Sequence, residues 1–264
     1  MTKVLLVGCG RMGSALLSGW LDRGIAAADL VVVDPTRPTV GPVTVVADAD
    51  SIPPGFVPDV VVLAVKPQMM DAALPPYRRF VATALFLSIA AGKPTAYFRR
   101  AFGDDLAIVR AMPNTPAAVR RGITVCFADE TVSADRRALA ASLLEAVGEV
   151  GWISDESQMD AVTALSGSGP AYVFLLAEAM AEAGVALGLD LDLAVRLARA
   201  TVAGSGELLR LSADSAGDLR RAVTSPAGTT AAALAVLMDE TAGFGPLLRD
   251  AIAAAEHRSR ELAG

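Results

Sequence analysis

Three glycines near the N-terminus have a spacing that is typical of a phosphate-binding turn. Gly8, Gly10 and Gly13 form the pattern G-x-G-x-x-G after a short apolar run, with Arg11 and Met12 between the last two. The first glycine permits a tight turn, the second lets the backbone approach a pyrophosphate, and the third allows close packing of a helix on a strand. The free N–H groups of that helix would face the phosphates. The spacing therefore predicts a dinucleotide site formed by these five residues.

An acidic residue stands where such a site needs one for the ribose. A second apolar run, Leu30 to Val33, ends in Asp34, 21 residues after Gly13, and the pattern expects its acid about 20 residues on. Asp34 would accept a hydrogen bond from a ribose 2′-OH and repel a 2′-phosphate, which favours NADH, whereas Thr36 and Arg37 could receive that phosphate. A glycine-rich turn and an unrelated aspartate are the alternative. The common register of turn, helix and acid favours the nucleotide.

Three later strand ends carry residues suited to the rest of the cofactor, because ligands bind beyond the carboxyl ends of strands in an open parallel sheet. Small residues at two of these ends leave room for a ligand. The third holds an asparagine in a rigid loop between two prolines, where its amide can orient a bound ring. For Lys66 alone, a solvated side chain in a proline turn is an alternative. The predicted contacts are Ala64, Val65, Lys66, Ala90, Ala91 and Asn114.

A second anion-binding element is predicted near the C-terminus. Ser225 suits the N-cap of a helix and Pro226 its first position, so the N–H groups of residues 227–230 would form a nest for a small carboxylate. A plain helix cap is the alternative for this stretch alone. The dinucleotide pattern upstream and a Gly/Ser-rich helix entry at residues 166–170 favour a substrate site.

These residues require a scaffold, and the first half of the chain alternates strand-like and helix-like segments as a doubly wound α/β domain does. After Trp152 only helical patterns follow. We therefore expect an α/β fold, with a Rossmann-type dinucleotide-binding domain over residues 1–152 and an all-α dimerisation and substrate domain over residues 153–264. The predicted strands are 3–7, 30–33, 43–47, 60–64, 85–89, 107–110, 123–127 and 150–153, and the predicted helices of this half are 14–21, 68–74, 94–102 and 134–147.

One predicted helix, Pro170 to Leu187, is apolar almost all round. Its only charges are Glu178 and Glu182, four residues apart and hence on one narrow stripe. A helical domain of about 110 residues has little interior of its own, so the need to bury this helix favours a partner subunit. We predict an obligate homodimer through the second domain, with a buried central helix of a monomer as the alternative.

Composition excludes several classes of partner. The chain has 264 residues and a net charge of −6, and its scattered arginines form no basic stripe for nucleic acid. No run is apolar and long enough for a membrane span, and Met1 leads straight into the first strand, so we expect a cytoplasmic protein without membrane contact. Cys9 and Cys126 stand alone, which predicts neither a disulfide nor a metal site. His257 lies in a charged segment and is expected at the surface.

Five motifs in order, G-x-G-x-M-G, A-V-K-P-Q, R-x-M-P-N-T-P, L-S-G-S-G-P-A-Y and S-P-x-G-T-T, cover nearly the whole chain. Together they resemble the pyrroline-5-carboxylate reductase family. The resemblance implies reduction of the cyclic imino acid 1-pyrroline-5-carboxylate to L-proline by a nicotinamide cofactor, the last step of proline biosynthesis. It also implies homodimers, which in this family often assemble into larger rings. Because the family generally prefers NADPH, we favour NADPH, while Asp34 leaves NADH open.

The resemblance also implies roles for substrate residues. Thr230 would hydrogen-bond the ring nitrogen as the catalytic residue, and the backbone around Gly228 and Thr229, with Ser225 beside it, would hold the carboxylate. A protonated imine is already an electrophile, so the site needs orientation more than a strong acid. Ala227 stands where the family has a glycine. We expect it at the second helical position, with an ordinary negative φ and no strain.

The sequence leaves three alternatives: a reductase of another small cyclic imine, a β-hydroxyacid dehydrogenase and a redox sensor. A β-hydroxyacid dehydrogenase would need a lysine acid/base in its helical half, and this chain has only Lys3, Lys66 and Lys93, which argues against it. A nucleotide-binding redox sensor without turnover is compatible with the fold. Such a sensor would not need a second anion nest, so the segment at residues 225–230 favours an enzyme.

Overall fold

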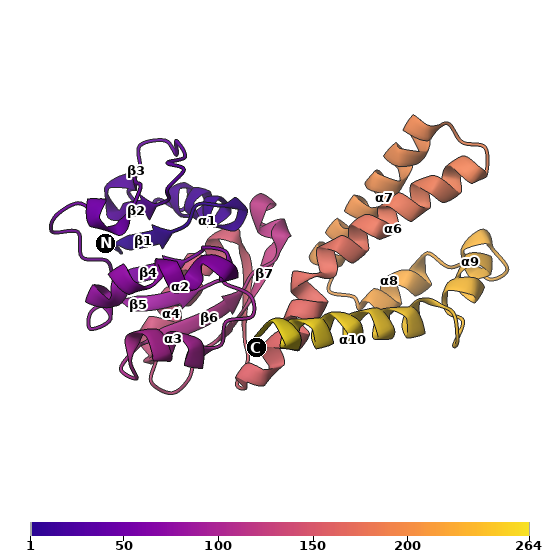
Figure 1. Cartoon of the computed structure of the whole chain (residues 1–264). Helices are drawn as coiled ribbons and strands as arrows, with labels where there is room; N and C mark the ends of the chain where they lie inside the picture. The colour runs from indigo at the N-terminus through magenta and orange to yellow at the C-terminus, as the bar shows by residue number, and fades with distance from the viewer. Residues whose placement is uncertain (1, 264) are drawn as a thin grey trace. The chain divides into compact units, whose positions relative to one another are not determined.

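The computed structural model describes residues 2–263, and its first part is an α/β fold (Figure 1). A mixed sheet of eight strands has the order β3-β2-β1-β4-β5-β6-β7-β8. Strands β1 to β6 run parallel, β7 is antiparallel to β6, and β8 is parallel to β7. Each predicted strand is present within a few residues, but the reversal at β7 was not predicted. The strands are β1 Val4–Val7, β2 Leu30–Val33, β3 Thr44–Val46, β4 Val60–Leu63, β5 Leu85–Ser88, β6 Ile108–Met112, β7 Gly122–Phe127 and β8 Gly148–Trp152.

Four adjacent strands, β2, β1, β4 and β5, are buried along their whole length. A strand that is covered on both faces is a continuous apolar run in the sequence. The segments VLLV, LVVV and VVVL could therefore be identified as strands although they do not alternate between apolar and polar residues. Alternate side chains enter two core clusters, one on each face of the sheet, with Leu6 in the first and Leu5 in the second. The sheet is therefore the middle layer of three.

Helices cover both faces. Residues of α1 and α4 belong to the first core cluster, and residues of α2 and α3 belong to the second. The helix predicted over residues 68–74 is only a 3₁₀ turn followed by the short α2, because Pro75 and Pro76 begin another turn there. The helix predicted over residues 134–147 ends three residues earlier, in a 3₁₀ turn. These helices are α1 Arg11–Asp22, α2 Met70–Ala73, α3 Thr95–Phe102, α4 Ala134–Leu144 and α5 Met159–Val162.

Contacts divide the chain into two compact units. The sheet unit comprises the chain up to Gly167 together with the segment from Glu256, and the helical unit comprises Ser168–Ala255. The returning segment is attached inside the sheet unit by the buried Ser259, whose hydroxyl donates to Asp160 Oδ1 at 2.7 Å. The domain boundary expected after residue 152 stays a prediction. The helices after β8 are α6 Gly169–Ala186, α7 Leu191–Leu211, α8 Ala216–Ala222, α9 Thr229–Leu237 and α10 Phe244–Ala263, of which α10 runs from one unit into the other.

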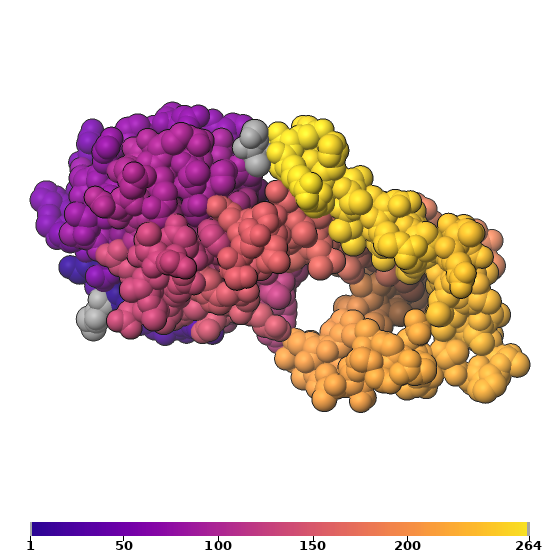
Figure 2. All heavy atoms as spheres, turned by 90° about the horizontal axis from the view of Figure 1, so that it is seen from below, coloured from indigo at the N-terminus to yellow at the C-terminus, as the bar shows by residue number. Residues whose placement is uncertain are grey.

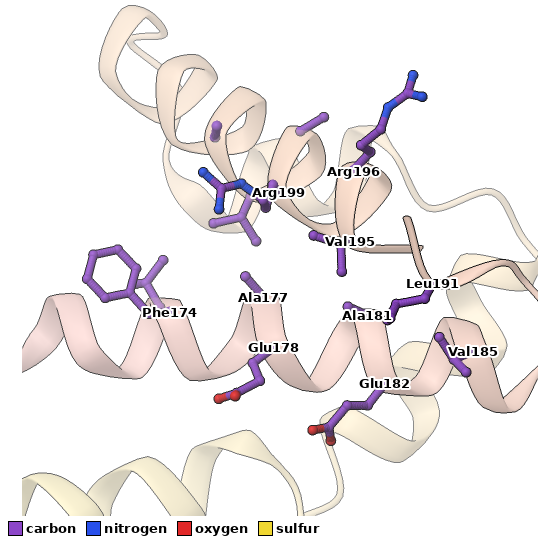
Figure 3. Close-up of a pocket in the computed structure, with 14 residues that line it drawn as sticks. Phe174, Ala177, Glu178, Ala181, Glu182, Val185, Leu191, Val195, Arg196 and Arg199 are labelled. Carbon is purple, nitrogen blue, oxygen red and sulfur yellow. The ribbon is translucent and has the colours of Figure 1, made fainter. Parts of the chain in front are cut away.

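The helical unit has almost no core of its own. Among its described residues, the buried apolar side chains are three alanines, Ala181, Ala194 and Ala198, whereas Phe174 is 66% and Leu191 is 61% exposed. Helices α6 and α7 lie side by side and line an open groove of about 1340 Å³ with mainly apolar walls (Figure 3). In Figure 2 the indigo to magenta atoms of the sheet unit are closely packed. The predicted apolar helix at 170–187 is therefore present, and largely uncovered.

Candidate functional site

The carboxyl ends of β1, β2, β4 and β5 meet at one edge of the sheet. Val7 is in register with Val33 on one side and Leu63 on the other. The Gly8 N–H donates to the Val33 carbonyl, and the Ala64 N–H donates to the Val7 carbonyl, both at 2.8 Å. The predicted cofactor residues that follow these strands are thus brought together. Because β1 lies between β2 and β4, this edge contains the switch point at which ligands bind in such sheets.

The glycine-rich turn has the geometry that its spacing predicts. Gly8 has φ +91°, and a Cβ there would come within 2.9 Å of the Ala64 carbonyl group. A Cβ at Gly13 would lie 2.5 Å from the Gly8 oxygen, whereas one at Gly10 would meet nothing within 4 Å. Gly10 is also the N-cap of α1 and offers no side chain to the helix end. The first N–H groups of α1 therefore remain available to an anion.

Asp34 is held by the turn itself. Its Oδ2 accepts from the Cys9 N–H at 2.7 Å, and its Oδ1 accepts from the Thr36 N–H at 2.9 Å and from Thr36 Oγ1 at 2.6 Å. Burial would raise the pKa of Asp34, but the hydrogen bonds from Thr36 and Cys9 outweigh it and lower the pKa. A fixed carboxylate therefore stands beside the glycine-rich turn. Sequence reasoning found Asp34 but missed Cys9 as its partner.

The two residues expected to receive a 2′-phosphate differ in what they can offer. Thr36 directs its hydroxyl hydrogen at Asp34, so that hydrogen is already used. Arg37 is exposed, has φ 46°, and donates its N–H to the Asp34 carbonyl at 3.0 Å. Of the pair, Arg37 has the cationic side chain that suits a phosphate.

The other predicted cofactor residues lie around the same edge. Arg11 is exposed as the first residue of α1, and Lys66 is exposed before the 3₁₀ turn that follows β4. Ala90 is buried, with its N–H donating to Ser88 Oγ at 3.3 Å, and its neighbour Ala91 is exposed. Met12, Ala64 and Val65 are half-buried.

Asn114 connects the end of β6 to the first Gly/Ser-rich motif. Its Nδ2 donates to Ser166 Oγ at 3.3 Å, and its Oδ1 accepts from the Ile123 N–H at 3.0 Å. Ser166 lies in a π-helical turn, Thr163–Gly167, a feature frequent at functional sites. A Cβ on Gly167 would come within 2.5 Å of Met112 Cε, so a larger residue there would require the Met112 side chain to move. Sequence reasoning singled out both motifs but did not predict their hydrogen bond.

The predicted geometry of the second anion nest is wrong at its start. Helix α9 begins at Thr229 with Gly228 as its N-cap, so Ser225 is not the cap and Pro226 is not the first helical residue. Residues 225–228 instead form a turn closed by the Gly228 N–H and the Ser225 carbonyl at 3.1 Å. The third residue of that turn, Ala227, has φ 57°, contrary to the expected negative value. The free helical N–H groups therefore begin at Thr229, and Thr230, half-buried, is the second residue of α9.

His257 and Cys126 lie outside these sites. His257 has a side chain 76% exposed, 3.2 Å from Glu261, which confirms the expected surface position. Cys9 and Cys126 are both buried, and burial raises the pKa of Cys126 to about 12. Within residues 2–263, none of the helices is both long enough and apolar enough to cross a membrane.

The layered sheet, its open glycine-rich turn and the acid after β2 define a nicotinamide-dinucleotide oxidoreductase with a Rossmann-type domain. Two family models match the chain: "NADP oxidoreductase coenzyme F420-dependent" over residues 3–92 and "Pyrroline-5-carboxylate reductase dimerisation" over residues 156–262. The pyrroline-5-carboxylate reductase of Pseudomonas aeruginosa is 41% identical over 99% of this chain and 97% of its own, and that of Haemophilus influenzae is 37% identical over 98% and 97%. The chain therefore belongs to the pyrroline-5-carboxylate reductase family.

Solved structures of the same family have the same fold as this chain. A pyrroline-5-carboxylate reductase from Coxiella burnetii superposes with a TM-score of 0.90 at 35% identity, covering 100% of this chain and 99% of that one. The Plasmodium falciparum pyrroline carboxylate reductase, solved with NADP bound, gives a TM-score of 0.84 at 28% identity, covering 100% and 98%. The expected fold class is confirmed.

Proposed function

We propose that this protein reduces 1-pyrroline-5-carboxylate to L-proline with NAD(P)H, the last step of proline biosynthesis. The observation that carries the proposal is the presence of two helix starts without side-chain caps on a chain of this family. One is the open helix start after Gly10, and the other is the start of α9 at Thr229. A dinucleotide needs the first and a small carboxylate substrate suits the second.

The substrate chemistry requires little from the protein beyond orientation. The N–H groups of Thr229 and Thr230 would bind the substrate carboxylate, and the Thr230 hydroxyl would hydrogen-bond the ring nitrogen. Bound NAD(P)H supplies the hydride that adds to the imine carbon. Because the protonated imine loses its charge in that step, no strong acid is needed, and the hydroxyl orients the ring. This explains why the exposed His257 is not required.

We propose NADPH as the usual donor, with the pyrophosphate at the glycine-rich turn and the 2′-phosphate near Arg37. The family and the NADP in the Plasmodium relative support this choice. The fixed carboxylate of Asp34 opposes it, because it accepts from a 2′-OH and repels a 2′-phosphate. We therefore expect a modest preference over NADH.

We also propose a homodimer, with the α6 and α7 face of one subunit covered by a second copy. The support is the match of residues 156–262 to the dimerisation model and the exposed apolar side chains of that face, such as Phe174 and Leu191. An uncovered apolar surface of this extent marks an association site. The larger ring and the cytoplasmic location expected from the sequence stay predictions.

A turnover assay with both nicotinamides tests the function. We expect loss of NADPH or NADH absorbance with 1-pyrroline-5-carboxylate, and slower loss with the six-membered imine. Asp34→Ser should raise the NADPH to NADH ratio of kcat/KM about tenfold or more. Asp129→Ser is the matched control, because Asp129 accepts the same two hydrogen bonds from Thr131 but follows the antiparallel strand β7, at the opposite edge of the sheet.

Each outcome of these assays distinguishes between possible functions. Binding of either nucleotide without turnover of any imine would overturn the proposal in favour of a redox sensor. Faster turnover of the six-membered ring would point to another cyclic imine as substrate. An unchanged ratio in Asp34→Ser would show that this carboxylate has no part in nucleotide choice.

A further inference from the structure

A buried polar network joins three segments of the sheet unit that are far apart in the sequence. Arg110, on β6, is only 5% exposed, and its Nη1 lies 3.1 Å from Glu156 Oε1. The same carboxylate accepts from the Thr95 N–H at 2.8 Å and from Thr95 Oγ1 at 2.7 Å. Removing Glu156 would leave a buried guanidinium without its counter-charge, which is costly in a protein interior.

Glu156 acts as the N-terminal cap of α3, although it lies 61 residues away from that helix start. The local N-cap is Pro94, whose side chain cannot accept a hydrogen bond, and the first turn of α3 contains no acidic residue. A carboxylate at a helix N-terminus satisfies an orphan N–H and interacts favourably with the helix dipole. By contrast, α1 begins without a side-chain cap. The start of α3 is therefore capped by Glu156, whereas the start of α1 has no side-chain cap and can bind a ligand.

The network fixes the loop between β5 and α3, residues 89–94, which contains Ala90 and Ala91. At one end of this loop the Ile89 N–H donates to the Leu63 carbonyl and the Ala90 N–H to Ser88 Oγ. At the other end, Thr95 is held only through Glu156 among the side-chain contacts described for it. The loop follows β5 at the edge where ligands bind in such sheets, so its position would affect how a cofactor is held there.

We propose that Glu156, oriented by Arg110, is a positioning residue that fixes loop 89–94 for the nicotinamide half of the cofactor. The inference rests on the proposed function for the identity of the reaction, but the network itself does not depend on it. Glu156 is also the first residue of the segment that matches the dimerisation model. The carboxyl-terminal family segment therefore begins with a residue that completes the dinucleotide domain.

The test compares Glu156→Gln and Thr95→Val with a matched control, Asp129→Asn. Asp129 likewise accepts from a threonine N–H, a threonine hydroxyl and an arginine, Arg99, but at the opposite edge of the sheet. We expect kcat/KM for the dinucleotide to fall about tenfold in the first two variants, since small misplacements of reacting groups have large rate effects. Thr95→Ser, which keeps the hydroxyl, should remain within about twofold of the wild type.

Unchanged kinetic constants in Glu156→Gln and Thr95→Val, with only a lower Tm like that of Asp129→Asn, would overturn the inference and leave a purely structural network. If Glu156→Gln does not fold, Thr95→Val and its rescue by Thr95→Ser carry the test. Should the wild type fail to reduce 1-pyrroline-5-carboxylate, NADPH affinity is measured by fluorescence instead. A weaker affinity in Thr95→Val than in Asp129→Asn then supports the positioning role, and equal affinities overturn it.

Discussion

The sheet unit and the helical unit solve the problem of burial differently. The sheet unit encloses large aromatic side chains such as Trp20, Phe86 and Phe98 at less than 2% exposure, and it has a core cluster on each face of the sheet. The helical unit leaves Phe174 and Leu191 more than half exposed. A layered α/β domain can close its core with one chain, whereas a hairpin of long helices with little else around it cannot. This difference supports the proposal that a second copy of the chain covers the helical unit.

The largest effect should follow from a charge on the α6 face. Phe174→Asp would place a carboxylate in the proposed dimer interface, at a cost of more than about 3 kcal/mol per subunit. We expect loss of the dimer in light scattering, together with loss of helical signal and activity. Val57→Asp is the control, because Val57 is 54% exposed in the sheet unit, before β4. A Phe174→Asp protein with the mass and Tm of the wild type would break the comparison.

Leucine truncations test the same contrast at a smaller scale. Leu17→Ala removes a side chain with 0% exposure and should destabilise the sheet unit by about 2–5 kcal/mol. In an isolated chain, truncating the exposed Leu191 would change stability by only about 0.5 kcal/mol. Within a dimer it should instead raise the dissociation constant about tenfold or more, which sedimentation over a range of concentrations measures. Equal dissociation constants for Leu191→Ala and wild type would argue against the proposed interface.

The smallest effect concerns Ala227. Ala227 has φ 57°, so replacing it with glycine would relieve backbone strain in the folded protein. Glycine also makes the unfolded chain more flexible, which offsets part of this gain. Ala227→Gly should therefore stabilise the protein by about 0.5 kcal/mol. Ala222→Gly, in the last residue of α8, should instead destabilise by about 0.5–1 kcal/mol. Chemical denaturation of both variants gives the two signs. Destabilisation by both would show that the left-handed conformation carries no strain.

Local sequence patterns predicted the elements that depend on local forces. The buried strands β2 and β4 were identified because a continuous apolar run has few other uses. The antiparallel direction of β7 was not predicted, because the direction in which two strands pair depends on the path of the chain between them. The start of α9 was misplaced because the capping rule favours Ser225, and it does not foresee a turn in which a Cβ on Gly228 would lie 2.4 Å from Ser225 Oγ.

The candidate site shows the same limit. Glycines and an aspartate at strand ends are visible in the sequence because their backbone roles restrict the residue type. The partners of Asp34 and of Thr95 are not visible, because one is a backbone N–H and the other a glutamate 61 residues away. Long-range polar partners require the tertiary fold before they can be assigned.

The return of the chain to the sheet unit at Glu256 has a consequence for biosynthesis. The ribosome must make the whole helical unit, residues 168–255, before Ser259 can reach Asp160 and complete the sheet unit. At a synthesis rate of about 5–20 residues per second, several seconds separate the two parts. The nucleotide-binding half is thus finished last, by a segment that emerges only after the apolar helices have themselves been exposed to the cell.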